Sequence, residues 1–392
     1  MTESVDVLVV GGGIHGVGCA QAAAAAGYSV KVLEETALAC GSSSRSSKLI
    51  HGGLRYLESW QWRLVRESLH ERTILLRIAP ELVRLRRFHI PLYRQTRRQS
   101  WQLAAGLSLY KVLSGFDPGA SFGRVPRASW HELDGLRTQD LHAVFWYHDA
   151  QTNDRLLTEA VMRSAAALGA QLHMPARFLG AELHEDGVAA RFSENGREQL
   201  CQARVLINAA GPWAAHVAHT MAPSIQVPSL ELVQGTHIII DKPASDRLFY
   251  VESPRDGRAI FFLPWQGRTM VGTTEVKFRG NPANVHATPH EVNYLQSIVR
   301  HYFPPASGAL PHLVDRFAGL RVLPAASGHA FHRSRETMLM PDRPLRPRVL
   351  SIYGGKLTTY RAVAQRVQSL ISAALPARKA RAQTDQLPLS PS

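Results

Sequence analysis

The residues from Ser43 to Leu57 bring small, basic and flexible side chains together in one short segment, Ser-Ser-Arg-Ser-Ser-Lys-Leu-Ile-His-Gly-Gly-Leu-Arg-Tyr-Leu. Serine hydroxyls and glycine backbone can approach a cofactor closely, and lysine and arginine can neutralise an anion. Histidine exchanges protons near neutral pH. We therefore expect this segment to serve both a buried cofactor and an anionic substrate.

A dinucleotide-binding pattern precedes this segment. A strand over residues 7–10 leads into a glycine turn and an alanine-rich helix, and a second strand ends at Glu34. Gly11 allows the tight turn, Gly13 lets a pyrophosphate approach the backbone, and Gly16 lets the helix lie close to the sheet. The helix N-terminus favours phosphate charge, and Glu34 stands where a carboxylate accepts hydrogen bonds from a ribose. The pattern predicts nucleotide binding.

Length and composition predict a large globular protein. The chain has 392 residues, of which 45% are hydrophobic, so we expect two closely packed domains. No apolar run is long enough to span a membrane, and the first strand begins too early for an export leader, so we expect a cytoplasmic protein. The three cysteines, Cys19, Cys40 and Cys201, read as reduced thiols. The eighteen histidines show no ligand spacing, and we expect no metal site.

The formal net charge of +14 raises the question of an anionic partner. Between Arg55 and Arg98 there are eleven arginines and four glutamates, interleaved with Trp60, Trp62 and aliphatic residues at helical spacing. This pattern fits a solvated basic face, or a surface resting on anionic lipid headgroups at the inner face of the cytoplasmic membrane. Nucleic acid binding is a third interpretation of this basic pattern, but we do not expect a nucleic acid partner.

The remaining chain alternates between two kinds of pattern, which predicts two interleaved domains. A long helical region reaches about Leu113. A strand, a helix from Asn153, a hairpin turning at Asn195-Gly196 and a buried strand over 204–211 then return to the nucleotide domain. Short strands between residues 237 and 272 predict an antiparallel sheet with a binding face. A strand over 349–353 and a helix to about residue 374 follow, and the polar tail is expected to be disordered.

Several motifs together resemble one family. Gly-Gly-Gly-Ile-His-Gly, Ser-Ser-Lys-Leu-Ile-His-Gly-Gly-Leu-Arg-Tyr-Leu, Asn-Ala-Ala-Gly-Pro-Trp, Gly-Thr-Thr-Glu and Gly-Gly-Lys-Leu-Thr-Thr-Tyr occur in this order. The chain resembles the FAD-dependent glycerol-3-phosphate dehydrogenases, within the D-amino-acid oxidase type of flavoproteins. The resemblance implies a mixed α/β fold, in which a Rossmann-like FAD-binding domain is interleaved with an antiparallel-sheet substrate domain. The expected FAD-binding segments are 1–85, 140–215 and 345–375, the substrate segments are 86–139 and 216–344, and the disordered tail is 376–392.

The resemblance also implies which residues contact FAD. The pyrophosphate would lie over the glycine turn, and the ribose would lie on the Glu34 carboxylate. The flavin would lie near the serines of the segment from Ser43 to Leu57 and near the Gly-Gly-Lys-Leu-Thr-Thr-Tyr motif. The implied cofactor residues are Gly11, Gly13, Gly16, Glu34, Ser46, Ser47, Gly52, Gly53, Asn208, Gly211, Gly355, Leu357 and Thr358.

A small phosphorylated substrate is implied in the same way. The family's substrate positions match Arg55, Tyr56, Arg321, Arg333 and Lys356, of which Arg321 is also counted as catalytic. Oxidation at C2 of glycerol 3-phosphate, by hydride transfer to flavin N5, would yield dihydroxyacetone phosphate. His51 is the expected proton acceptor, and the alternative is that His51 only packs beside the flavin.

We expect a departure from the family at the C-terminal end, with neither the helical cap domain of the aerobic members nor the cysteine-rich extension of the anaerobic ones. A quinone is the expected electron acceptor, with oxygen or a protein as alternatives, and the oligomeric state stays open. Two other functions remain. The same fold could oxidise another small anionic alcohol or amine, or the chain could be a non-catalytic flavin-binding protein at a membrane.

Overall fold

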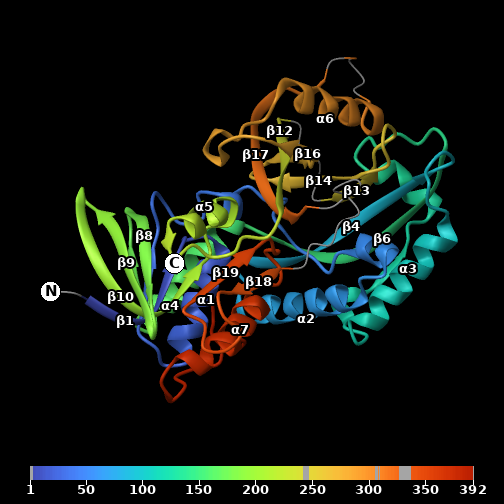
Figure 1. Ribbon diagram of the computed structural model, residues 1–392. Helices are drawn as coiled ribbons and strands as arrows, with labels where there is room; N and C mark the ends of the chain where they lie inside the picture. The colour runs from blue at the N-terminus through green and yellow to red at the C-terminus, as the bar shows by residue number, and fades with distance from the viewer. Residues whose placement is uncertain (1–2, 242–246, 305–307, 309, 326–336, 392) are drawn as a thin grey trace.

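Two β-sheets, each covered by helices, form the protein (Figure 1). The computed structural model describes residues 3–241, 247–304, 308, 310–325 and 337–391. Within these ranges one sheet has nine strands and the other ten, and the chain passes from one sheet to the other repeatedly. The expected mixed α/β fold with interleaved units is confirmed. No helix of the described ranges is long and apolar enough to cross a membrane.

The first sheet carries the glycine turn at the end of its central strand. Strands β1, β2, β7, β10 and β19 run parallel, and β8 and β9 extend the sheet in antiparallel fashion from the first half of β10. Its strands are β1 Glu3–Val10, β2 Val30–Leu33, β7 Gln171–His173, β8 Ala176–His184, β9 Gly187–Glu194, β10 Arg197–Asn208, β11 Met221–Ala222, β18 Met338–Pro341 and β19 Val349–Tyr353. The helices α1 (Ile14–Ala25), α4 (Asp154–Ala167) and α7 (Tyr360–Ile371) share one apolar core with β1, β2, β10 and β19. Such all-apolar strands suit a parallel sheet with both faces covered.

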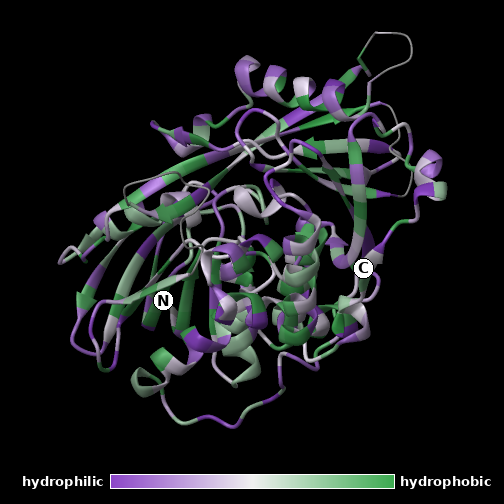
Figure 2. Ribbon diagram, turned by 90° about the vertical axis from the view of Figure 1, so that its right-hand side faces the viewer, coloured by the Kyte–Doolittle hydropathy of each residue, from purple (hydrophilic) through white to green (hydrophobic). Residues whose placement is uncertain are grey.

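The second sheet is antiparallel except where β13 pairs with β4. Its strands are β3 Leu49–Ile50, β4 Val83–Tyr93, β5 Phe122–Arg124, β6 Leu141–Thr152, β12 Leu230–Ile240, β13 Leu248–Glu252, β14 Ala259–Trp265, β15 Arg268–Gly272, β16 Val276–Phe278 and β17 Leu313–Pro324. Helices α2 (Trp62–Ile78) and α3 (Ser100–Leu113) share an apolar core with one part of this sheet, and α6 (Pro289–Tyr302) shares another. The short helix α5 (Ala214–His219) follows the first sheet's β10. Figure 2 shows that the apolar residues concentrate on the strands and the inner sides of the helices.

Local turn and cap signals in the sequence were reliable. Asn195 and Gly196 both have positive φ, +51° and +75°, as a two-residue hairpin turn requires. The Asn153 side chain caps α4 by accepting a hydrogen bond from the Leu156 amide at 3.2 Å. These features were predictable because a few neighbouring residues determine them.

The arginine-rich region differs from the prediction. Helix α2 ends at Ile78, and residues 83–93 form β4 in place of a continuing helix. Strand β4 pairs with β6 along its whole length, so residues 141–152 lie in the second sheet and not in the nucleotide-binding unit to which we assigned them. The partner strand lies about fifty residues away in sequence, and local periodicity carries no information about such pairing.

The expectation of a disordered tail is wrong for residues 376–391. Leu389 is 3% exposed within the core of the first sheet's helices, and its amide donates to the Ile78 carbonyl at 2.7 Å. The Arg381 amide donates to the Ala25 carbonyl, also at 2.7 Å. The tail therefore lies across the ends of α1 and α2. The polar, proline-rich composition of the tail did not indicate that one leucine is deeply buried and that several backbone hydrogen bonds hold the segment in place.

Candidate active site

The glycine turn has the close approach that its sequence predicts. Gly11 follows β1 with φ of +109°, and Gly13 precedes α1. A Cβ at Gly16 would lie only 1.9 Å from the Gly11 carbonyl oxygen, so only glycine lets α1 approach the turn this closely. The Glu34 carboxylate accepts a hydrogen bond from the Gly12 amide at 2.7 Å. The turn, the helix N-terminus and the carboxylate therefore meet at one point.

The segment after β10 lies beside this turn. A Cβ at Gly11 would meet the Ala209 carbonyl oxygen at 2.7 Å. Asn208 is fully buried, and its side-chain amide donates to the Ala214 carbonyl at 2.8 Å, so Asn208 shapes the turn that ends at Gly211. The expected passage of this segment along the nucleotide-binding edge agrees with that geometry.

The serines divide between three structural environments. Ser46 donates to Asp154 at 2.6 Å, away from the glycine turn, and Ser47 lies 2.9 Å from Nε2 of His237. Ser43, which the sequence did not single out, accepts a hydrogen bond from the Ile14 amide at 2.9 Å at the start of α1. Ser43 therefore lies at the N-terminus of α1, and Ser46, which was expected beside the flavin, is hydrogen-bonded to Asp154.

The loop from His51 to Gly53 is held from both sides. The Thr358 hydroxyl lies 3.1 Å from the His51 amide, which links the loop to the segment before α7. On the other side, the Gly52 amide donates to the Tyr110 hydroxyl at 2.9 Å and to Asp149 at 3.2 Å.

A buried ion pair supports this loop from behind. Arg72 is fully buried and donates to the Asp149 carboxylate at 2.7 Å, and the Tyr110 hydroxyl donates to the same carboxylate at 2.8 Å. Burial raises the pKa of Asp149, and the Arg72 charge opposes that rise. From the sequence, Arg72 was expected only as one of the arginines of a basic surface.

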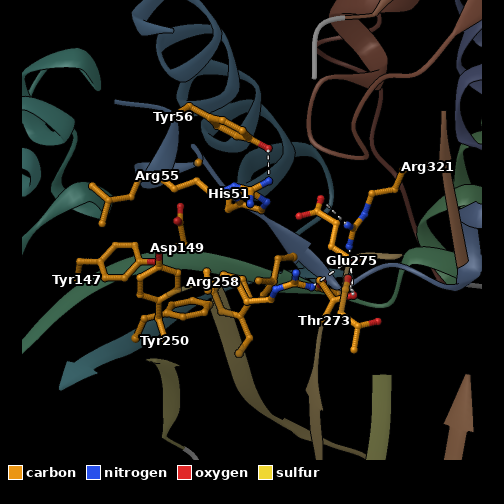
Figure 3. Close-up of a pocket in the computed structure, with 18 residues that line it drawn as sticks. His51, Arg55, Tyr56, Tyr147, Asp149, Tyr250, Arg258, Thr273, Glu275 and Arg321 are labelled. Carbon is orange, nitrogen blue, oxygen red and sulfur yellow. Dashed lines mark hydrogen bonds and ion pairs between the residues drawn. The ribbon is translucent and has the colours of Figure 1, made fainter. Parts of the chain in front are cut away.

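A cavity opens between this loop and the second sheet (Figure 3). Its empty space of about 750 Å³ includes space that is open to solvent. Its polar lining includes Ser47, His51, Arg55, Tyr56, Tyr147, Asp149, Tyr250, Arg258, Thr273, Thr274, Glu275 and Arg321. His51, Arg55, Tyr56 and Arg321 were expected here from the sequence, and the fold brings them to one cavity.

Two cations lie against the Tyr56 ring. The Lys356 ammonium is 4.0 Å from the ring centroid, and the Arg55 guanidinium carbon is 5.0 Å from it. Arg55 also donates to the Tyr56 hydroxyl at 3.4 Å. The expected substrate positions Arg55, Tyr56 and Lys356 therefore form one cluster, although about 300 residues separate Lys356 from the other two.

A second cluster lies across the cavity. Arg321 is 3.3 Å from the Glu275 carboxylate and 3.2 Å from the Thr273 hydroxyl, and Arg258 donates to the Glu275 carbonyl at 3.4 Å. Figure 3 shows Arg258 and Arg321 approaching Glu275 from different segments, Arg258 from just before β14 and Arg321 from β17. Neither Arg258 nor a role for Glu275 was predicted from the sequence. The only local signal was the position of Arg258 immediately before an apolar strand.

Other expected site residues lie in the Gly-Gly-Lys-Leu-Thr-Thr-Tyr motif. Gly355 has φ of +101°, and a Cβ there would lie 2.2 Å from the His15 ring. Leu357 packs against the core of the first sheet, next to Thr358. Arg333 falls within residues 326–336, outside the described residues.

The chain matches the family model described as FAD dependent oxidoreductase over residues 6–360. It therefore belongs to the FAD dependent oxidoreductase family, as the glycine turn and the two-sheet architecture indicated. This membership confirms FAD as the expected cofactor.

Within this family the chain is similar to dehydrogenases of small polyol phosphates. It is 36% identical over 377 residues to the glycerol-3-phosphate dehydrogenase of Pseudomonas aeruginosa, covering 93% of this chain and 71% of that protein. It is 35% identical over 371 residues to the D-erythritol 1-phosphate dehydrogenase of Brucella abortus, covering 93% and 73%. The solved glycerol-3-phosphate dehydrogenase of Bacillus halodurans, complexed with FAD, superimposes with a TM-score of 0.75 at 24% identity, covering 99% of this chain and 68% of that one. The resemblance read from the motifs is confirmed.

Two buried histidines predict an acid-sensitive fold. Burial lowers the pKa of His89 to about 4, and burial together with Arg321 and Lys48 holds the pKa of His237 well below its usual value. Below pH 6.5 an unfolded histidine binds a proton that the folded one does not, so unfolding becomes easier as pH falls from 6.5 to 4. Each histidine contributes up to about 1.4 kcal/mol per pH unit.

Chemical denaturation across this pH range checks the expectation. The variant His89→Gln should lose less stability between pH 6.5 and 4 than the wild-type protein. The exposed His142 provides the matched control, since His142→Gln should leave the slope unchanged. Equal slopes for all three proteins would contradict the assignment.

Proposed function

We propose that the protein oxidises a small polyol phosphate, sn-glycerol 3-phosphate in the first instance, to the corresponding ketone phosphate, dihydroxyacetone phosphate. The observation that carries this proposal is the convergence of Arg55, Arg258 and Arg321 on one cavity. Several guanidinium groups facing one cavity suit a phosphate dianion, which arginine binds through paired hydrogen bonds. FAD, when bound, accepts the hydride released from C2.

The glycine turn and Glu34 fit this cofactor. Gly11 and Gly16 leave no space for a Cβ, so bare backbone is available at the N-terminus of α1, where pyrophosphate is favoured. Glu34 would bind the ribose and Ser43 would lie near the phosphates. The loop of Gly52 and the segment 355–358 would edge the flavin, where a helix N-terminus favours negative charge.

The two clusters of cations would each bind a different end of the substrate. Arg55 and Lys356, which both lie against the Tyr56 ring, would hold one end of the substrate. Arg321 and Arg258 would hold the other end, where the Glu275 carboxylate and Thr273 hydroxyl could also accept or donate hydrogen bonds to alcohol groups. A phosphate and a polyol chain would thus both find partners.

D-Erythritol 1-phosphate is the second candidate substrate. The relative from Brucella abortus carries that name, and its identity to this chain matches that of the glycerol-3-phosphate dehydrogenases. The cavity is open to solvent on one side, so its lining leaves room for a longer polyol chain to extend outward. The same catalytic arrangement would serve both substrates.

The test is reduction of the bound flavin without oxygen. The purified protein, loaded with FAD, is mixed with glycerol 3-phosphate, D-erythritol 1-phosphate or unphosphorylated glycerol, and the visible flavin band is followed. We expect bleaching by at least one phosphate ester and none by glycerol. The ratio of the two rates identifies the preferred substrate. A flavin that neither ester bleaches would contradict the proposal.

We further propose a quinone as electron acceptor and an anionic membrane as the place where the protein meets it. The supporting observation is a tryptophan surface, defined here as Trp60, Trp62 and Trp101, with exposed fractions of 77%, 42% and 70%. Val112 and Phe116 continue it along and beyond α3. Exposed Arg63 and Arg66 flank this apolar surface, a combination typical of helices that lie in a lipid interface.

Vesicle sedimentation checks the membrane proposal. Removing both large aromatic groups, in Trp60→Ala with Trp101→Ala, should weaken binding to vesicles of anionic lipid by about tenfold or more, because apolar burial drives interfacial binding. Leu345→Ala is the control, since Leu345 is 81% exposed and lies outside this surface. Equal binding by both variants would contradict the proposal. Reoxidation of the reduced protein by a soluble quinone, compared with oxygen, tests the acceptor separately.

A further inference from the structure

Tyr56 lies in an unusual electrostatic environment for a tyrosine. It is 4% exposed, in the short 3-10 helix Leu54–Ser59, and its ring packs directly on Gly53, where a Cβ would lie 2.3 Å from the ring. Lys356 and Arg55 contact the ring, and Arg55 donates to the hydroxyl. The two positive charges favour a phenolate at this position over a neutral phenol, and burial acts in the opposite direction.

The other charged and titratable groups around the cavity do not cancel this effect. His51, Asp149, Tyr250, Arg258, Glu275 and Arg321 line it. Asp149 is committed to Arg72 at 2.7 Å, and Glu275 is 3.3 Å from Arg321. On its other side Tyr56 packs in an apolar core with residues of α2 and α3. Arg55 and Lys356 are thus two cations in direct contact with the Tyr56 ring, and the Glu275 charge also acts on Arg55.

We propose that the Tyr56 phenolate accepts the hydroxyl proton of the substrate, which makes Tyr56 a catalytic residue and not only a binding one. This inference rests on the proposed polyol phosphate oxidation. The substrate O–H bond breaks and a new O–H bond forms on the Tyr56 oxygen, while the carbon–hydrogen bond breaks with its electron pair going to FAD. The alcohol becomes a ketone, and the tyrosine later returns its proton to water.

Tyr56 suits this role better than His51. A histidine that takes up a proton becomes a cation, and the nearby guanidinium groups disfavour a further positive charge. A phenolate that takes up a proton becomes neutral, so proton transfer to Tyr56 adds no positive charge to a cavity that already holds several cations. The His51 backbone is tied to Thr358, which is consistent with a role in shaping the loop.

The variant Tyr56→Phe isolates the hydroxyl, because the ring and both cation contacts are retained. We expect flavin reduction by the preferred substrate to slow by a hundredfold or more, as loss of a general base does, with less than about a tenfold change in the substrate Kd. Tyr28→Phe, at a tyrosine remote from the cavity, should behave as wild type. A normal rate with only a weakened Kd would show that Tyr56 merely binds the substrate, and would overturn the proposal.

A second readout does not depend on turnover. Burial raises the pKa of Tyr93, Tyr110, Tyr147, Tyr250, Tyr294, Tyr302, Tyr353 and Tyr360. An early tyrosinate absorbance step should therefore appear in the wild-type protein and in Tyr28→Phe, and be absent from Tyr56→Phe. Without that difference the inference fails, even if the substrate bleaches the flavin. If no ester bleaches the flavin but the step is present, the proposed function alone fails.

Discussion

Gly16→Ala is expected to destabilise the fold and to abolish FAD retention. The added Cβ would lie 1.9 Å from the Gly11 carbonyl oxygen, and backbone cannot yield as a flexible side chain can. Helix α1 would have to move away from β1, which opens the core that it shares with α4 and α7. We expect a loss of about 3 kcal/mol in the free energy of unfolding, the upper range for overpacking.

The measurement combines denaturant unfolding with the flavin content of the purified protein. Gly106→Ala is the matched control, because a Cβ at Gly106 in α3 meets nothing within 4 Å. Alanine there should be neutral or stabilise the protein by about 0.5–1 kcal/mol, since glycine is unfavourable in a helix interior. Wild-type flavin content in Gly16→Ala would mean that the turn does not hold the cofactor.

Arg72→Met is the second change with a large expected effect. Arg72 and Asp149 are both buried and 2.7 Å apart, and the variant leaves the Asp149 carboxylate without its counter-charge. Removing one partner of a buried ion pair costs about 3–5 kcal/mol. Asp149 also accepts from the Gly52 amide, so the loop of His51 should lose its support and flavin reduction should slow.

An exposed ion pair gives the comparison. Arg191 and Glu198 lie 3.1 Å apart with both side chains about half exposed, so Arg191→Met should change stability by less than about 1 kcal/mol. Urea unfolding of both variants measures the contrast. If Arg72→Met were no more destabilising than Arg191→Met, Asp149 would have to be held chiefly by Tyr110, and the double variant with Tyr110→Phe would then reveal the loss.

Much of the cofactor site was predictable from short segments. The roles of Gly11 and Gly16, and the position of Glu34 beside the turn, depend on a strand, a turn and a helix that are adjacent in sequence. The hairpin at Asn195 is of the same kind. The elements that were assigned wrongly depend on distant parts of the chain. Strand β4 forms because it pairs with β6, and the tail is ordered because it packs on the core over which it lies.

The substrate cavity depends both on short sequence motifs and on contacts between distant segments. The motifs identified Arg55, Lys356 and Arg321 as separate basic positions, but nothing local indicated that Arg55 and Lys356 would share the Tyr56 ring. Arg258 was missed because an arginine before a strand is common, and its significance comes from Glu275, which precedes β16, and from Arg321 in β17.

The sequence by itself determined the family, the cofactor and the local geometry of its phosphate turn, because glycine conformation and a helix N-terminus act over a few residues. The tertiary structure alone decided that Arg72 is a buried support for the His51 loop, and that two cations lie against the Tyr56 ring. Such roles depend on which segments the sheets bring together. The free energy of a buried charge depends on the partner it meets, and that partner lies elsewhere in the chain.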